Sequence, residues 1–234
     1  MAQQRMMRKF AKWHIWLGWL VGVPVLMWTV SGLVMVARPI ETVRGTDLRK
    51  ELPEQALPAD TNIAVSLPSG TTRPVRAVTT QVERGETVTR IAYMDGTAER
   101  FRADGSKMGP LTDVEARLIV AEAISGGDKV ADVKRFPADA VPFDFRREMP
   151  VWQVMLADGT NVYVGIESGQ IEAVRTRWWR FYDFMWGLHI MDLQTREDTH
   201  HPILIAFAAL SMFGALLGCI LMFRRRKARV KVPT

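Results

Sequence analysis

The sequence predicts an α+β membrane protein in which two transmembrane helices flank a folded domain. Two apolar runs, 15–37 and 203–223, contain no charged residue. Each exceeds the roughly 18 residues that identify a membrane-spanning helix. Between them, paired turn sequences and a single capped helix are typical of an antiparallel sheet with one helix. The sheet and the helix are therefore expected to form one domain on one side of the bilayer.

Basic residues are concentrated at the two ends of the chain. Four precede the first apolar run, six follow the second, and neither end carries an acid. Lys and Arg stay on the cytoplasmic side of a membrane, so both termini are predicted to be cytoplasmic and the domain to be outside. The net charge of the whole chain is +6, so the two ends account for more than all of it and the domain is negative. Nucleic acid is therefore not an expected partner.

The first apolar run is predicted to be retained rather than cleaved as a signal peptide. It is longer than the roughly 7–15 residues of a signal-peptide core, and the sequence at 36–39 lacks the small-residue pattern of a cleavage site. The single cysteine, Cys219, lies in the second run, so no disulfide forms within the chain. The lipid bilayer is therefore the first predicted partner.

Composition divides the chain into segments of different character. The connector after the first run combines prolines with scattered charges and is expected to contain little regular structure. The segment before the second run carries Trp178, Trp179 and Trp186, whose rings favour the headgroup zone. The predicted boundaries are a basic arm at 1–12, a transmembrane helix at 13–37, a connector at 38–61, a β-rich first unit at 62–109, an α+β second unit at 110–177, an interfacial segment at 178–201, a transmembrane helix at 202–223 and a basic tail at 224–234.

The domain pattern predicts one helix among several short strands. Thr112 and Glu115 have the spacing of a capping box at the start of a helix over 111–123. Val114, Leu118 and Ala121, together with Ile119, are expected to form its apolar face. The strands are expected at 74–82, 87–94, 98–102, 129–136, 151–157, 161–166 and 170–174.

The turn sequences repeat along the domain. Residues 94–97 read Met-Asp-Gly-Thr and residues 157–160 read Ala-Asp-Gly-Thr. In both cases a strand follows, and then a second turn with glycine, at 104–105 and 168–169. Asp-Gly suits tight hairpin turns because its residues accept positive φ. The repeat predicts two degenerate copies of one small β unit.

The domain and its flanks resemble a known pair of families. The helix sequence LTDVEARLIVAEA, followed by PVWQVMLADGTNVYVGIESGQIEAV, resembles the PepSY domain. The flanks KWHIWLGWLVGVPVLMWTVSGLVM and WGLHIMDLQTREDTHHPILIAFAALSMFGALLG are similar to the PepSY-associated transmembrane family. On this resemblance, 110–177 is a PepSY domain and 62–109 is a first PepSY-like unit.

The resemblance implies a bacterial inner-membrane protein with a periplasmic domain and a role in iron or haem metabolism. Some larger members of the family have four spans, bind haem through membrane histidines and reduce ferric siderophores by passing electrons outward. This chain departs from them because it has two apolar runs. The resemblance therefore implies at most a component of a haem-dependent ferric or ferric-siderophore reductase, and whether the chain is an enzyme stays open.

Four histidines are the candidate cofactor-binding residues. His14 lies at the inner end of the first apolar run, and His189, His200 and His201 lie near the outer end of the second. Ionisable groups at membrane depth mark functional sites, and neutral imidazole is a standard axial ligand of haem. The other interpretation is that the histidines form hydrogen bonds at the interface. For His200 and His201, adjacent to Pro202, a helix cap is the first expectation.

The spacing of the histidines restricts how haem b is held. His14 and the outer histidines are separated by one bilayer core of about 30 Å, so they cannot share an iron within one chain. A homodimer has four spans and pairs His14 with His14 and His189 with His189. The sequence therefore predicts a homodimer with haem b that passes electrons to a periplasmic ferric complex, such as a ferric siderophore. The alternative is a non-enzymatic anchor whose domain binds a periplasmic protein or restrains a peptidase.

Overall fold

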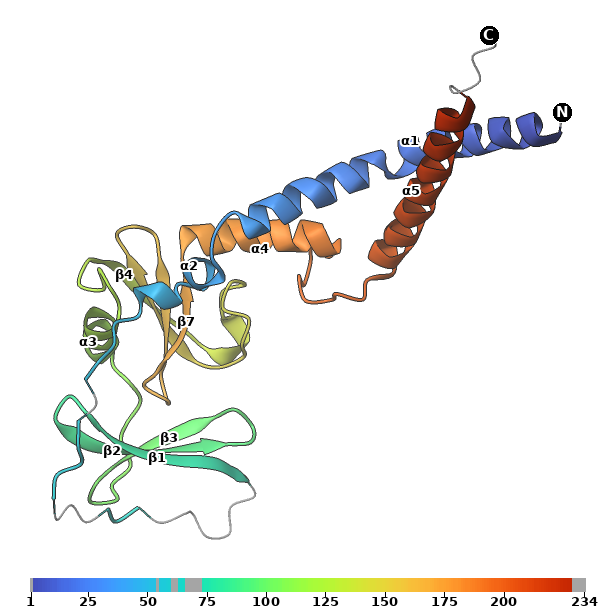
Figure 1. Cartoon of the computed structure of the whole chain (residues 1–234). Helices are drawn as coiled ribbons and strands as arrows, with labels where there is room; N and C mark the ends of the chain where they lie inside the picture. Colours follow the sequence, from blue (N-terminus) through green and yellow to red (C-terminus); the bar gives the residue numbers. More distant parts are fainter. Residues whose placement is uncertain (1, 54, 60–62, 66–72, 229–234) are drawn as a thin grey trace. The chain divides into compact units, whose positions relative to one another are not determined.

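The computed structural model describes residues 2–53, 55–59, 63–65 and 73–228 (Figure 1). The chain forms two compact units, Met1–Pro39 with Phe181–Thr234, and Ile40–Arg180. The first is the helical unit, and the second, the β unit, holds the sheets. Part of the predicted basic tail, 229–234, lies outside the described residues.

Long apolar helices dominate the helical unit. They are α1 (Ala2–Val36) and α5 (Pro202–Ala228), accompanied by α4 (Arg177–Ile190), which belongs to this unit from Phe181 onward. Two stretches, Gln4–Val36 and Pro202–Phe223, are long and apolar enough to cross a membrane, which confirms the two predicted apolar helices. α1 begins before residue 13 because the basic arm continues the helix, and it runs through Pro24 without ending. α4 occupies a segment for which the sequence indicated an interfacial position but no helix.

The described part of the β unit contains two antiparallel sheets, where the sequence predicted one sheet built from two copies. The strand orders are β1-β2-β3 and β4-β5-β6-β7. All the predicted strands are present, and each end lies within one residue of its predicted position. The strands are β1 (Val75–Glu83), β2 (Glu86–Tyr93), β3 (Ala98–Arg102), β4 (Val130–Phe136), β5 (Val151–Leu156), β6 (Asn161–Gly165) and β7 (Ile171–Arg175), with a 3₁₀ turn η2 (Ala138–Ala140) between β4 and β5.

The repeated turn sequences form the same hydrogen bonds in both sheets. In the β2–β3 turn, Oδ1 of Asp95 accepts the N–H of Thr97 at 2.9 Å. In the β5–β6 turn, Oδ1 of Asp158 accepts the N–H of Thr160 at 2.8 Å. The glycine after the aspartate has a φ of 84° in the first turn and 81° in the second, a conformation that glycine adopts without strain. The hairpin therefore occurs once in each sheet.

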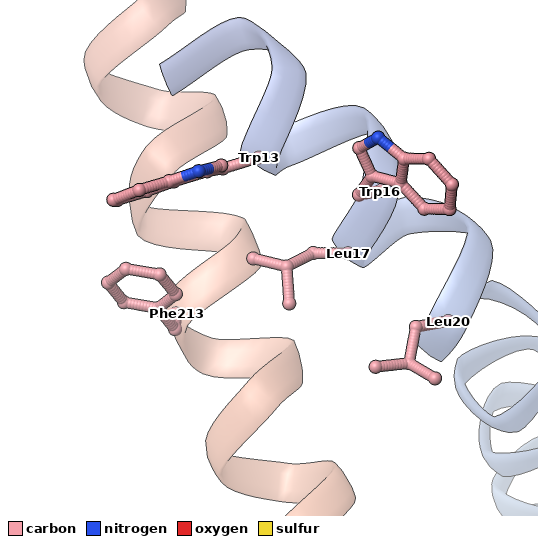
Figure 2. A pocket seen from close by; sticks show the side chains of 5 residues that line it. All are labelled: Trp13, Trp16, Leu17, Leu20 and Phe213. Carbon is pink, nitrogen blue, oxygen red and sulfur yellow. The ribbon is translucent and has the colours of Figure 1, made fainter. Parts of the chain in front are cut away.

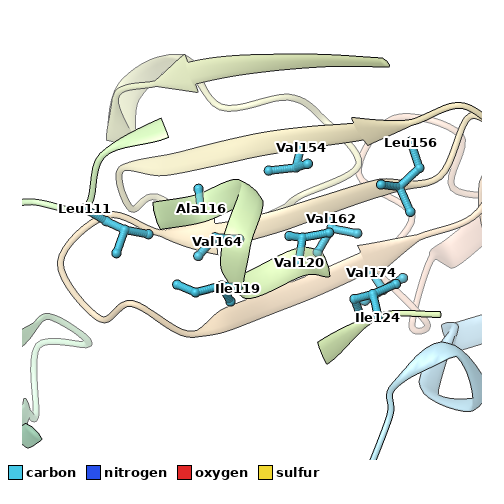
Figure 3. Packing of buried hydrophobic residues seen from close by; sticks show 10 residues of the cluster. All are labelled: Leu111, Ala116, Ile119, Val120, Ile124, Val154, Leu156, Val162, Val164 and Val174. Atoms are coloured by element: carbon cyan, nitrogen blue, oxygen red, sulfur yellow. The ribbon is translucent and has the colours of Figure 1, made fainter. Parts of the chain in front are cut away.

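α3 (Asp113–Ala123) packs on the second sheet and closes its core (Figure 3). The predicted capping box is present, because Oγ1 of Thr112 accepts the N–H of Glu115 and Oε2 of Glu115 accepts the N–H of Thr112 at 2.8 Å. The predicted apolar face is confirmed for Ile119, which is buried, but wrong for Val114 and Leu118, which are 60% and 49% exposed. The buried cluster consists of Leu111, Ala116, Ile119, Val120, Ile124, Val154, Leu156, Val162, Val164 and Val174.

The connector begins with regular structure, contrary to the prediction. A short helix α2 (Ile40–Arg44) and a 3₁₀ turn η1 (Thr46–Leu48) are followed by an isolated β-bridge between Arg49 and Ile124. This bridge joins the connector to the end of α3 and therefore to the core of the second sheet. Residues 54 and 60–62 of the connector and of the first predicted unit lie outside the described residues.

Two buried arginines connect the first sheet to the second. Arg90 and Arg100 lie directly opposite each other on β2 and β3 and are 6% and 3% exposed. Nε of Arg90 donates to the carbonyl of Ser168 at 2.7 Å in the β6–β7 turn, and its Nη2 pairs with Glu83 at 2.7 Å. Nη2 of Arg100 donates to the carbonyl of Gly109 at 3.1 Å. Burial lowers the pKa of Arg100, because desolvation disfavours the charged guanidinium.

Candidate functional site

The four candidate histidines all lie in the helical unit. His14 is on α1, His189 is on α4, and His200 and His201 directly precede α5. The sequence placed His189 at the outer end of the second apolar helix, but α4 is a separate helix that ends at Ile190. A loop over 191–201 therefore separates His189 from the other two outer histidines.

His14 packs against the glycines of α5. A Cβ added to Gly218 would lie 2.9 Å from Cε1 of His14, and a Cβ added to Gly214 would lie 3.8 Å from Leu17. These contacts agree with the expectation that a Gly-x-x-x-Gly face allows close helix packing. The corresponding glycines of α1, at 18 and 22, have nothing within 4 Å of an added Cβ in the described chain. The α1–α5 contact therefore uses one glycine pair and leaves the other open.

The hydrogen bond of His14 fixes which ring nitrogen carries the proton. Nδ1 lies 3.0 Å from the carbonyl oxygen of Gly214. A carbonyl oxygen only accepts, so Nδ1 of a neutral ring is the donor. Nε2 then has a free lone pair, and no group of the described residues hydrogen-bonds to it. In metal sites a histidine is oriented in this way, with one nitrogen on a backbone carbonyl and the other on the metal.

His189 has the same tautomer for a different reason. Its Nδ1 lies 3.0 Å from Oγ of Ser31 on α1. The hydroxyl of Ser31 has one hydrogen, which it donates to the carbonyl of Trp28 at 3.0 Å. Oγ therefore accepts the hydrogen of Nδ1, and Nε2 of His189 has a free lone pair without a hydrogen-bond partner among the described residues.

Small and aromatic residues of α1 surround His189. A Cβ added to Gly32 would lie 3.3 Å from Cε1 of the imidazole, so glycine allows the ring to come close. The rings of Trp28 and His189 have centroids 5.7 Å apart and are inclined at 45°. Nε1 of Trp28 is buried and has no acceptor among the described residues. A buried donor without an acceptor costs free energy, so a bound group with an acceptor atom would stabilise this position.

An apolar hollow lies between α1 and α5, lined by Trp13, which precedes His14 in the chain, but not by His14 itself (Figure 2). Its volume is about 390 Å³. The indole rings in its wall are 53% and 75% exposed, which agrees with tryptophans that face a membrane interface. The lining carries no charged side chain and consists of Trp13, Trp16, Leu17 and Leu20 from α1 with Phe213 from α5.

His200 and His201 begin the second apolar helix. The N–H of His200 donates to Oδ1 of Asp198 at 2.9 Å. The carbonyl of His201 accepts the N–H of Ile205 at 3.2 Å and so caps the first turn of α5. Nδ1 of His201 is buried and has no partner in the described part of the chain. These contacts favour the helix-cap interpretation over ligation for both residues.

The structure does not bring the histidines together. From His14 to Ser31, the contact of His189, α1 rises about 26 Å over about 17 residues. One iron cannot reach both rings. Within the described residues, no group of three His, Cys, Asp or Glu side chains is placed to hold a metal ion. One chain therefore offers a single oriented histidine at each of two depths.

Sequence reasoning missed several residues that orient the two rings. Ser31, Gly32 and Trp28 were not identified, although a serine next to a glycine inside an uncharged run is a usable signal of helix contact. Gly214 and Gly218 have the four-residue spacing typical of a helix contact face, but that spacing does not indicate His14 as the partner. That pairing depends on how α1 and α5 cross, which local sequence does not specify.

Comparisons of the chain with family models, with curated proteins and with solved structures find no match. The resemblance to the PepSY families therefore stays a prediction, and the histidine geometry is the basis for a functional proposal.

Proposed function

We propose that the chain is an inner-membrane PepSY protein that binds haem b and passes electrons across the membrane to a periplasmic ferric complex. The proposal is based on one observation. His14 and His189, at opposite ends of α1, both carry the proton on Nδ1 and present an Nε2 without a partner among the described residues. Axial histidines of haem are oriented in this way.

The surroundings of both rings support a planar, largely apolar group rather than a hydrated metal ion. The hollow between α1 and α5 is lined by apolar and indole side chains, one of them from Trp13, the neighbour of His14 in the chain. Beside His189, the buried Nε1 of Trp28 lacks an acceptor among the described residues, and haem has carboxylate groups that accept hydrogen bonds. Bound haem would supply one-electron transfer between ferric and ferrous iron.

A second copy of the chain is proposed to supply the second axial ligand at each depth. One chain has one oriented histidine at each depth, and bis-histidine coordination needs two. Gly18 and Gly22 leave part of α1 open, and a second α1 can approach closely there. Such a homodimer has four membrane helices, the number found in the larger members of the family that the chain resembles.

The chain's own residues have defined roles in this proposal. Gly214 and Ser31 accept the Nδ1 hydrogens and so direct Nε2 towards the iron. Gly218 and Gly32 let the two imidazoles approach their neighbouring helix. The depth of each ring along α1 sets one iron near the cytoplasmic side and the other near the side of the domain.

One feature of the first sheet favours a second candidate function. β1 pairs with β2 on one edge, and no described strand pairs with its other edge. An open edge can accept an extended segment of another protein. In this alternative the chain is a membrane anchor whose domain binds a periplasmic partner or restrains a peptidase, and the histidines serve as helix contacts.

The optical spectrum of the full chain, purified from haem-replete cells, tests the proposal. We expect a Soret band, and we expect His14→Ala and His189→Ala each to remove one of the two haems. His200→Ala is the matched control, because this residue is exposed and its N–H bond to Asp198 is a backbone contact that the variant keeps, so the band should be unchanged. A folded but colourless protein would refute haem binding and favour the anchor. Full absorbance in both alanine variants would refute these ligands.

A further inference from the structure

The contact of His189 gives the depth to which α4 reaches. Its ring touches Ser31 and Gly32 of α1. Ser31 lies about six residues before Ala37, the last residue of the uncharged run, which is about 9 Å of helix rise. One leaflet of the hydrocarbon core is about 15 Å thick. Where α1 crosses the bilayer, the end of α4 therefore reaches well into the leaflet on the side of the domain.

The outward face of α4 is apolar. Phe181 and Phe184 are each 42% exposed, and Leu188 follows them at helical spacing. The opposite face carries Asp183, which is 5% exposed. A helix on a water-covered surface has the reverse distribution, with its polar residues outward. The distribution on α4 is the one expected of a helix in contact with lipid.

The buried carboxylates around the end of α4 are paired within the helical unit. Oδ2 of Asp183 pairs with Nη1 of Arg196 at 2.6 Å, and Nε1 of Trp186 donates to the carbonyl of Arg196 at 3.0 Å. Asp192 is 7% exposed, and its carboxylate accepts five hydrogen bonds from the loop itself. The donors are the N–H groups of Gln194, Thr195, Glu197 and Asp198 and the hydroxyl of Thr195.

Such internal satisfaction is what membrane depth requires. Irregular backbone within the hydrocarbon layer is tolerated only where its polar groups are bonded to protein or line a wet cavity. α4 itself has 14 residues, or about 21 Å, which is shorter than the core thickness of about 30 Å. It is therefore too short to be a third span.

We infer that α4 is a re-entrant segment whose C-terminal end lies in the leaflet, and that the loop after Asp192, in which Gln194, Glu197 and Asp198 are exposed, lies in the headgroup zone. The segment enters the leaflet on the domain side, ends beside Ser31 and returns to the surface before α5, with Phe181 and Phe184 against acyl chains. Lipid is the occupant because the end of α4 contacts α1 at Ser31, and Val30 and Leu33, which lie beside Ser31 in α1, are 50% and 69% exposed. The inference needs α1 to cross the bilayer, but it does not need haem.

Spin labels on the full chain in phosphatidylcholine nanodiscs test the inference. Cys219→Ser removes the native cysteine, and Phe184→Cys or Phe181→Cys places the label on the stripe. Val114→Cys is the matched control, because Val114 is an apolar residue that is 60% exposed in the β unit. Oxygen partitions into lipid and a nickel chelate stays in water. We expect the stripe labels to collide more with oxygen, and the label at position 114 to collide more with the chelate.

Two outcomes overturn the inference. If the stripe labels collide with the nickel chelate as often as the label at position 114 does, water covers the stripe. If neither reagent reaches them, protein covers it, as in packing against a second copy. Two stripe positions are used so that one poorly folded variant, recognised by circular dichroism, does not end the test. A colourless protein with lipid-exposed labels would refute the haem proposal alone.

Discussion

The two ends of α1 hold a histidine in the same tautomer by different means. His14 donates its Nδ1 hydrogen to the backbone carbonyl of Gly214 on α5. His189 donates to the side chain of Ser31 on α1. The acceptor at the inner end cannot be removed by a substitution, whereas the acceptor at the outer end can. The inner contact therefore depends on steric fit between helices, and the outer contact depends on one hydroxyl group.

The largest effect is expected from Gly218→Val, which breaks the fit at the inner end. Its Cβ would lie 2.9 Å from Cε1 of His14, so the ring must move away from α5 and lose its bond to Gly214. Overpacking of this kind costs about 1–3 kcal/mol. Thermal unfolding in detergent measures the loss. Leu216→Val is the control, because Leu216 lies on the same helix and is 56% exposed. Equal losses in the two variants would contradict the steric explanation.

A smaller effect is expected from Ser31→Ala at the outer end. The variant removes the acceptor of His189, and a hydrogen bond of this kind contributes about 0.5–1.5 kcal/mol. Nitrogen chemical shifts of the imidazole are expected to change from a single tautomer to a mixture. Thr29→Ala is the control, because the Thr29 hydroxyl bonds to Val25 on an exposed part of α1. An unchanged tautomer in Ser31→Ala would show that another group orients the ring.

Gly32→Ala is expected to change stability less than either variant. Its Cβ would lie 3.3 Å from Cε1 of His189, so the ring needs to shift by only a few tenths of an ångström. Alanine also favours a helix over glycine by about 1 kcal/mol, which offsets the strain. Thermal unfolding of Gly32→Ala and of Gly218→Val under the same conditions gives the comparison. A loss as large as that of Gly218→Val would show that the outer ring is held as rigidly as the inner one.

The smallest effect is expected from lowering the pH, which should reduce the stability of the β unit through its aspartates. Hydrogen bonds from Thr97, first from its hydroxyl and second from its N–H, lower the pKa of Asp95. Hydrogen bonds from the side chain and the backbone of Ser106 lower the pKa of Asp104 in the same way. A lowered folded-state pKa stabilises the fold above the unfolded value of about 3.9, and this contribution disappears as pH falls through the lowered value. Melting temperatures should therefore decline below about pH 4, and less so in Asp95→Asn. An equal decline in Asp95→Asn and in the unaltered chain would contradict this explanation.

Elements specified by local chemistry were predictable from the sequence. The capping box of Thr112 and Glu115 and the Asp-Gly turns are set by residues close in the chain, so pattern reasoning located them and the strands that they bound. The face of α3 was mispredicted because several stripes of that helix are apolar. Tertiary contact with the second sheet selects the stripe with Ile119 and Val120, and Val114 stays exposed.

For the candidate site, the sequence predicted which residues take part but not which residues surround them. All four histidines were identified, but their neighbours depend on helix crossing, which has no local signature. α4 was missed because aromatic residues occupy six of its 14 positions and lie on more than one face, which masks the helical period over 177–190. The position of that helix decides that His189 contacts α1 rather than α5.

The buried arginine pair affects how the β unit can be divided. A fragment that stops before the β6–β7 turn keeps the guanidinium groups of Arg90 and Arg100 but loses the carbonyl of Ser168. It also loses Gly169, where an added Cβ would lie 3.0 Å from Nη1 of Arg100. Despite their matching hairpins, the two halves are therefore not interchangeable modules. Each is completed by the other, and the whole of 40–180 is the smallest piece that is expected to fold cooperatively.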